Sequence, residues 1–218
     1  RSIADLKKLM KLSDNLAQLN VERYQQWTTE TTEQRAKQAI LAFRGDVYAG
    51  MAATAFEQQD FDFAQQHLRI LSGLYGLLRP LDMIQPHRLE MGTRLENSRG
   101  KDLYAYWKSE NAPLINRAVK EAGGPIVNLA SNEYFSSVES PQLESPVVTP
   151  VFKDEKSGVY KVISIYAKKA RGMMCDFVIR NRLQQPQQLK AFSAAGYRFS
   201  EQDSDERQLL FLRREQDR

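Results

Sequence analysis

The strongest constraint on the fold is a pair of β-rich segments that flank a short turn-forming sequence. Val147–Lys153 and Val159–Tyr166 are rich in β-branched and aromatic side chains, whereas Asp154–Gly158 holds residue types that favour turns. The pattern predicts an antiparallel hairpin. Its second strand runs directly into the basic sequence Tyr166–Gly172, after which apolar residues at helical spacing predict a helix.

The remaining segments mix helices with short strands. A second hairpin is predicted to join Tyr197–Phe199 to Gln208–Leu212 through an acidic turn. Further elements are predicted, in chain order, as a helix from Ile3 to Leu19, a helix capped by Asp60 and stopped at Gly73, a strand over Arg88–Met91, helices over Asp102–Lys108 and from Pro113 to Gly123, and a strand over Ile126–Ala130. We therefore expect an α+β fold with antiparallel hairpins, as a single compact domain over residues 1–218.

The amino-acid composition indicates a globular protein outside the membrane. A chain of 218 residues with 42% hydrophobic and 27% charged side chains is typical of a globular protein that folds without a metal or cofactor. No apolar run approaches the roughly 18 residues of a membrane-spanning helix, so we expect no membrane association. The single cysteine, Cys175, forms no internal disulfide, and the start at Arg1 shows no signal-like segment. These features predict a cytoplasmic protein.

Basic charge is concentrated in one segment. The whole chain has 31 Lys and Arg against 27 Asp and Glu, a net charge of +4. Between residues 161 and 182 there is one acid, Asp176, and the basic residues there are Lys161, Lys168, Lys169, Arg171, Arg180 and Arg182. This local excess, rather than the net charge, indicates an anionic partner.

The sequence lacks the common catalytic and nucleotide-binding signatures. It contains no P-loop, no dinucleotide-binding glycine motif, no H-E-x-x-H, no nucleophile elbow and no C-x-x-C. His67 and His87 are expected to be ordinary polar side chains, and with one cysteine they do not supply a zinc tetrad. Cys175 is expected to be an inert thiol, although Arg171 nearby leaves a reactive thiol as an alternative. We expect neither a metal site nor a cofactor.

A glycine-containing turn is the first candidate binding element. Leu71–Pro80 contains the turn Gly73-Leu74-Tyr75-Gly76, whose backbone N–H groups suit a phosphate, and Arg79 and Arg88 supply matching charge. The alternative is a capped helix end followed by a tight turn with no ligand.

The second candidate element is the basic junction between the predicted strand and the helix after it. Lys168, Lys169 and Arg171 lie close to a helix N-terminus, where cations are mildly unfavourable unless an anion binds. Arg171 suits bidentate phosphate contact and the lysines suit point-charge contact, with Arg180 and Arg182 extending the positive surface. The alternative is a solvated basic stretch.

Several motifs resemble those of the YaaA family of bacterial peroxide stress proteins. They lie at Phe43–Tyr48, Leu71–Asp82, Arg88–Gly92, Asn128–Ser131, Glu133–Phe135 and Tyr166–Gly172. The resemblance implies one α/β domain of unusual topology, a positively charged cleft and a helix-hairpin-helix-like element that binds duplex and branched DNA. It also implies a cytosolic role in limiting iron-dependent DNA damage under peroxide.

Carried over by position, the resemblance assigns the helix-hairpin-helix-like element to Leu71–Pro80 and the basic site to Lys168, Lys169 and Arg171. Family members usually open with a strand and a Ser-Pro-Ala-Lys-Thr-Leu-Asp stretch, so this chain is expected to lack the N-terminal strand of the family. His87 stands where the family commonly has tyrosine.

Our leading hypothesis is a non-catalytic DNA-binding protein of the peroxide stress response. Its expected contacts to the phosphates of duplex or branched DNA are Gly73, Leu74, Tyr75, Gly76, Arg79, Arg88, Lys168, Lys169 and Arg171. This hypothesis requires that the glycine turn and the basic junction form one face.

Two other hypotheses stay open. One is an enzyme that acts on a small anionic or phosphorylated metabolite in the same basic cleft, with Asp46, Glu90 or Glu133 transferring protons. The other is direct iron binding, which needs a cluster of histidines and carboxylates and is disfavoured by the presence of only two histidines.

Overall fold

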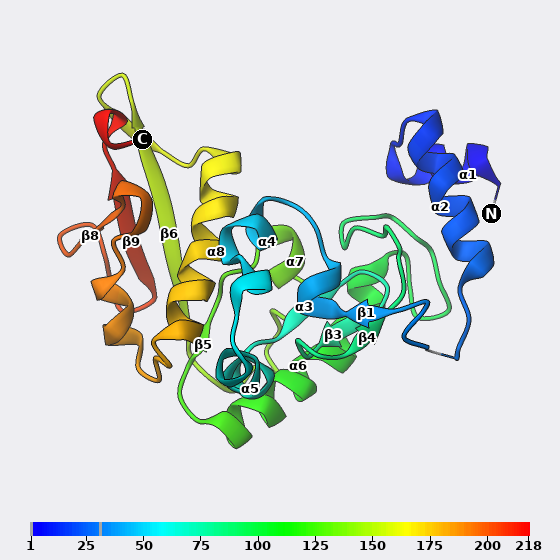
Figure 1. Ribbon diagram of the computed structural model, residues 1–218, viewed down its shortest axis with the longest axis horizontal. Coiled ribbons are helices and arrows are strands. Elements are labelled where there is room, and N and C mark those ends of the chain that lie inside the picture. The colour runs from blue at the N-terminus through cyan, green and yellow to red at the C-terminus, as the bar shows by residue number, and fades with distance from the viewer. Residues whose placement is uncertain (1, 31) are drawn as a thin grey trace. The chain divides into compact units, whose positions relative to one another are not determined.

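The computed structural model describes residues 2–30 and 32–218 and has the expected mixed α/β fold (Figure 1). Its internal contacts divide the chain into two compact units. The first unit comprises the chain up to Ala42, Leu68–Asn116 and Ser131–Leu143, and the second comprises Phe43–His67, Arg117–Ala130 and Glu144–Arg218. That residues 1–218 form a single domain stays a prediction.

The first unit begins with two helices where the sequence predicted one. Helix α1 (Ile3–Met10) is capped by Ser2, whose hydroxyl accepts a hydrogen bond from the Asp5 amide. It ends at Lys11, which has a φ of 53°, and Ser13 then caps helix α2 (Asp14–Gln26). The apolar spacing did not reveal the break between α1 and α2, because the break depends on the left-handed conformation of one residue and on a new N-cap, and neither changes that spacing.

Short antiparallel ladders make up much of the rest of the first unit. Strand β1 (Lys37–Gln38) pairs with β4 (Met83–Ile84), and β2 (Ile70–Ser72) pairs with β3 (Gly76–Leu78). The other helices of this unit are α3 (Ala39–Ala42), α7 (Asn132–Phe135) and the first part of α6 (Leu103–Ala122), which runs on into the second unit.

A mixed sheet forms the centre of the second unit. Strand β6 (Val147–Lys156) pairs in parallel with β5 (Ile126–Val127) at its start and with β9 (Gln208–Arg213) along most of its length. Strands β7 (Val159–Lys161) and β8 (Arg198–Ser200) add antiparallel to β6 and β9. Both predicted hairpins are therefore confirmed, whereas the parallel pairings join segments far apart in the chain and were not predicted.

Helix α8 (Ser164–Arg180) covers one face of this sheet (Figure 1). Phe152 of β6 and Phe211 of β9 are buried in one apolar cluster with Ala170 and Met174 of α8. The other helices of this unit are α4 (Asp46–Met51), η1 (Ala53–Ala55), α5 (Gln58–His67), η2 (Pro186–Ala191), η3 (Ala194–Gly196) and η4 (Glu215–Asp217). Of these, α4 and α5 pack against α8.

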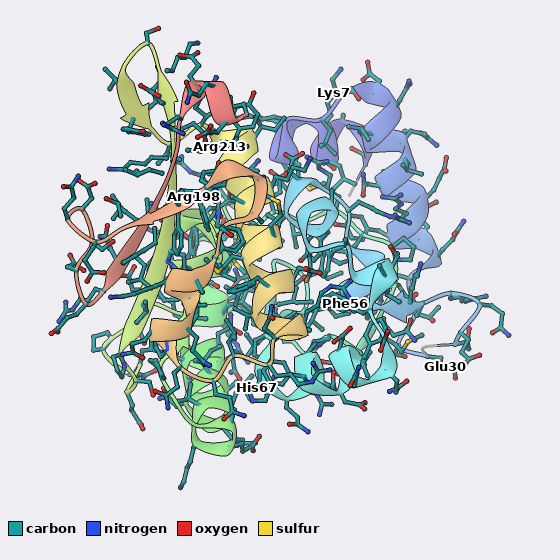
Figure 2. All side chains as sticks on the ribbon, turned by 60° about the vertical axis from the view of Figure 1, so that its left-hand side comes forward. Lys7, Glu30, Phe56, His67, Arg198 and Arg213 are labelled. Atoms are coloured by element: carbon teal, nitrogen blue, oxygen red, sulfur yellow. The ribbon has the colours of Figure 1, made fainter. Side chains whose placement is uncertain are left out.

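A buried ion pair joins the two central strands of the second unit. The Nε of Arg213 donates to Oδ1 of Asp154 at 2.7 Å, and the Tyr197 hydroxyl donates to Oδ2 at 2.9 Å. Figure 2 marks Arg213 at the end of β9, where its guanidinium lies over the rings of Tyr197 and, on α8, Tyr166. The sequence placed Asp154 in the hairpin turn, but it is a strand residue, and the turn is formed by Ser157 and Gly158.

Other local predictions are corrected. Residues 88–91 are irregular rather than a strand, because the Tyr24 hydroxyl donates to the Arg88 carbonyl and Gly73 packs against Leu89. Pro113 lies inside α6 instead of starting a helix. Asp60 is a buried residue within α5, and the predicted extension of that helix to Leu71 forms strand β2.

Among the described residues, no helix combines the length and the apolar character needed to cross a lipid bilayer.

Candidate functional site

The glycine turn of the first unit is a β-hairpin loop held by Ser72. The Ser72 hydroxyl oxygen accepts hydrogen bonds from the amides of Leu74 and Tyr75, at 3.3 and 3.2 Å. The His87 ring donates through Nδ1 to the Gln85 carbonyl at 3.0 Å, which leaves Nε2 to accept from the Ser72 hydroxyl at 3.4 Å. Burial lowers the pKa of His87, in agreement with a neutral ring. The two loop amides are therefore already hydrogen-bonded inside the protein.

Both glycines of this turn are needed for close packing. A Cβ added to Gly73 would overlap the Leu89 carbonyl oxygen, and the Gly73 carbonyl accepts a hydrogen bond from the Trp107 indole at 2.9 Å. Gly76 has a φ of 71°, and a Cβ there would lie 2.5 Å from the Trp107 ring. The segment Leu71–Pro80 thus forms a β-hairpin, and within the described residues no helix follows it before α6. The expected helix-hairpin-helix-like geometry is not found here.

The two arginines assigned to the turn have carboxylate partners. Arg79 pairs with Asp82 at 3.3 Å, and Arg88 pairs with Glu90 at 2.6 Å. All four side chains are at least partly exposed, so water screens these pairs and the guanidinium groups remain accessible to a stronger anion.

Two of the three candidate acids gather around Tyr134. Glu133 accepts a hydrogen bond from the Gly92 amide at 2.9 Å. The pKa of Tyr134 is raised to about 12, first by burial and then by the negative charges of Glu133 and Glu90. The third candidate, Asp46, lies in the second unit at the start of α4. The enzymatic role proposed for these acids stays a prediction.

The basic segment of the second unit lies in the first half of α8. Lys168 and Lys169 are exposed, and neither forms an ion pair with any other residue that the structure describes. Arg171 differs from them, because it is partly buried and its Nε donates to the Ala167 carbonyl at 3.2 Å. Burial lowers the pKa of Arg171. The lysines are therefore the accessible cations of this segment.

The predicted site left out two exposed lysines of the adjoining hairpin, although Lys161 was counted in the basic segment. Lys156 and Lys161 lie in the β6–β7 hairpin, they are exposed, and among the described residues they too have no ion-pair partner. The signal was present, because the predicted hairpin leads directly into the basic segment. We call Lys156, Lys161, Lys168 and Lys169 the lysine row.

Arg180 and Arg182 do not extend the positive surface as expected, because their charges are compensated. Both contact the buried carboxylate of Asp60, at 3.7 and 3.3 Å, and Arg180 also pairs with Asp176 at 2.9 Å. Their role is to neutralise a carboxylate with little access to water.

The remaining candidate side chains have structural environments. Cys175 is buried on α8, and burial raises its pKa to about 12. The His67 ring stacks on Phe63 and donates to the Phe63 carbonyl at 2.9 Å. Both agree with the expectation of an inert thiol and an ordinary polar histidine.

The predicted DNA contacts are distributed over both units. Gly73, Leu74, Tyr75, Gly76, Arg79 and Arg88 belong to the first unit, and Lys168, Lys169 and Arg171 belong to the second. In the first unit Gly73 packs against Leu89, next to Arg88, and in the second unit Lys168, Lys169 and Arg171 share the first half of α8. The formation of one face by both groups stays a prediction.

Comparison with known proteins gives a consistent result. The family model described as peroxide stress protein YaaA matches residues 1–203. A UPF0246 protein from Tolumonas auensis is 55% identical over 213 residues, which is 97% of this chain and 82% of that protein.

Proposed function

The chain belongs to the YaaA family of peroxide stress proteins, and from this premise we propose that it acts in that response by binding double-stranded DNA through its backbone phosphates. Phosphate contacts fix a protein on a duplex without reading the base sequence. The expected binding therefore depends on the shape and charge of the DNA and little on its sequence.

The lysine row is the observation that carries this proposal. Its four side chains come from one hairpin and the helix that follows it, so they are neighbours along a continuous piece of the second unit. None has a carboxylate partner among the described residues, whereas Arg180 and Arg182 nearby are paired. A cation without an internal partner can displace the counterions of DNA at little cost, which is the main source of non-specific affinity.

The start of α8 adds to this electrostatic surface. No acidic residue lies in its first turn, and its N-cap, Ile163, supplies no side-chain hydrogen bond. The positive end of the helix dipole therefore adds to the charges of Lys161 and Lys168. The amides of Leu74 and Tyr75 contribute less to the proposal, because Ser72 already accepts their hydrogen bonds.

The test is a salt titration of duplex binding, followed by fluorescence anisotropy. We expect log affinity to fall linearly with log salt concentration, and the double substitution Lys168→Ala and Lys169→Ala to make the slope less negative by about 1.8, at roughly 0.9 per lost phosphate contact. The matched control is Lys108→Ala with Lys120→Ala, which removes two exposed lysines from α6. An equal loss in both variants, or no salt dependence, would reject the lysine row as the site.

We also propose that DNA binding serves to limit iron-dependent damage. Plasmid nicking by ferrous iron and hydrogen peroxide measures this directly. The wild-type protein is expected to reduce nicking, and the Lys168→Ala, Lys169→Ala variant to protect less at equal concentration. Equal protection by the variant would mean that protection against peroxide does not depend on DNA contact through Lys168 and Lys169.

A further inference from the structure

Three aliphatic side chains beside the lysine row are more exposed than any other large apolar side chains among the described residues. Val159 of β7 is 62% exposed, Val162 is 58% exposed and Ile165 at the start of α8 is 57% exposed. The other exposed large apolar residues, including Leu114, are at most 41% exposed. We call Val159, Val162 and Ile165 the aliphatic ridge. Isolated exposed aliphatic residues are common, but three within one short segment indicate contact with a partner.

The hairpin that carries Val159 is held together by backbone hydrogen bonds and tied to the C-terminal segment. Lys156 pairs with Val159 across a two-residue turn, in which Ser157 and Gly158 have φ values of 54° and 77°. Positive φ at both positions is what a type I′ turn requires, and glycine reaches it without strain. The Ser157 amide also donates to Glu215 at 3.0 Å, which ties the turn to η4. In Figures 1 and 2 the tip of this hairpin projects beyond the first turn of α8.

The charge around the ridge is positive. Lys156, Lys161 and Lys168 are interspersed with the aliphatic residues along the chain. Asp154 is buried against Arg213, Glu155 accepts a hydrogen bond from the Glu215 amide, and Glu215 at the same hairpin pairs with Arg218 at 3.6 Å, so these three carboxylates already have partners. A surface that is both cationic and apolar is complementary to a polyanion that also offers an apolar interior.

Two partners have that chemistry, duplex DNA and an anionic membrane. Membrane-binding elements use a long amphipathic helix with a broad apolar face, because affinity grows with the apolar area that enters the lipid. The ridge is only three β-branched side chains, spread from strand β7 to the first turn of α8. Proteins that bend DNA use this smaller arrangement, in which aliphatic wedges enter the minor groove between base steps and basic residues hold the flanking phosphates.

We infer that the aliphatic ridge is a wedge that enters the minor groove of the bound duplex and kinks it, while the lysine row holds the adjacent phosphates. This inference rests on the proposed function and adds that binding deforms the DNA. Partial unstacking of the base pairs costs free energy, and this cost is smallest at flexible or already distorted base steps. The protein therefore favours DNA that is easily bent.

The experiment compares bending with affinity. A duplex of about 30 base pairs, a length over which smooth bending is costly, carries a donor and an acceptor dye at its ends, with a flexible TA step at the centre. The wild-type protein is expected to raise energy transfer on binding. The variant Val159→Thr, Val162→Thr, Ile165→Thr keeps the β-branched shape at each position and is expected to bind with the same salt slope but leave the duplex straight.

A matched control removes apolar surface elsewhere. Leu16→Thr, Leu19→Thr, Leu114→Thr changes three leucines that are 38–41% exposed in α2 and α6, and it is expected to bend DNA as the wild type does. Circular dichroism of each variant verifies that it is folded.

The outcomes separate the two proposals. A wild-type protein that binds the duplex without bending it, or a ridge variant that bends it equally, overturns the wedge and leaves DNA binding intact. A wild-type protein that binds no duplex overturns both. Binding to phosphatidylserine-containing vesicles that the ridge variant loses, with bending unchanged, would assign the ridge to a membrane instead.

Discussion

Gly172 of α8 lies directly against the carbonyl oxygen of Val47 in α4. A Cβ added to Gly172 would overlap that oxygen and would lie 2.8 Å from the Met51 amide nitrogen. Gly50 of α4 makes the reciprocal approach to the Lys169 carbonyl. The two helices thus pack backbone to backbone, and this contact fixes the part of α8 that carries half of the lysine row.

The first prediction is that Gly172→Ala destabilises the protein. In an exposed helix, alanine is about 1 kcal/mol more favourable than glycine. The methyl group has no space here, and forcing it between two backbones costs about 1–3 kcal/mol or more. We expect the clash to exceed the gain in helix propensity, so that the free energy of unfolding falls by about 1–2 kcal/mol in urea titrations followed by circular dichroism. A variant as stable as the wild type would show that α4 and α8 can move apart freely.

A second prediction concerns the buried pair of Asp154 and Arg213. Asp154→Asn keeps the shape of the side chain but leaves the Arg213 guanidinium without a counter-charge, at a cost of about 3–5 kcal/mol. Tyr197→Phe removes one hydrogen bond to the buried Asp154 carboxylate and is expected to cost less, about 1.5–3 kcal/mol. Equilibrium unfolding in urea measures both.

The matched control for this pair is Asp217→Asn. Asp217 pairs with Arg214 on the surface, where water screens the interaction, so its loss is expected to destabilise the protein far less than Asp154→Asn does. Equal costs for Asp154→Asn and Asp217→Asn would mean that burial does not strengthen the Asp154 pair.

Local elements of the fold were predictable from the sequence because their signals lie within a few residues. The β6–β7 and β8–β9 hairpins combine β-branched runs with turn residues, and the structure confirms both. The parallel pairing of β6 with β9 depends on residues far apart in the chain, for which periodicity holds no information. The strand expected at Arg88–Met91 failed for a similar reason, because Tyr24 and Gly73 engage its backbone.

The sequence predicted which types of residue form the candidate site. It did not predict which of their charges are exposed and unpaired. The sequence identified Lys168, Lys169 and Arg171 together, yet only tertiary packing shows that Arg171 is partly buried. Likewise, Arg180 appeared as a free cation until the fold brought Asp60 to it. Which charges remain unpaired depends on long-range contacts, and a single sequence does not encode these in any local pattern.

A third prediction is that Cys175 does not react with peroxide in the folded protein. Burial raises its pKa from an ordinary 9.0 to about 12, and the thiolate is the reactive form. The thiolate fraction near neutral pH is then about a thousandfold below that of a free cysteine. We expect 5,5′-dithiobis(2-nitrobenzoate) to label Cys175 only after urea denaturation, and Cys175→Ala to protect plasmid DNA as the wild type does. Rapid labelling of the native protein would instead indicate a redox role.

The last prediction concerns Tyr134, which lies close to two of the three candidate acids, Glu90 and Glu133. Its pKa of about 12 has burial as the largest cause, and the negative charges of Glu133 and Glu90 add to it. Removing one charge by Glu133→Gln is therefore expected to lower the pKa of Tyr134 toward its ordinary value of 10.0. Absorbance at 295 nm across an alkaline titration measures this, after subtraction of the Tyr134→Phe titration to isolate one of the nine tyrosines.

The same shift makes stability depend on pH at the alkaline end. Below pH 10 the phenol is protonated in both the folded and the unfolded chain, so it contributes nothing to the pH dependence. Above pH 10 the unfolded chain ionises first, because the folded-state pKa is about 12, and the free energy of unfolding falls. Glu133→Gln should reduce this fall, whereas the control Glu139→Gln, an exposed acid on the same segment, should leave it unchanged. An identical Tyr134 titration in both variants would place Glu133 too far away to act on this phenol, and a joint role of the two groups in proton transfer would then be excluded.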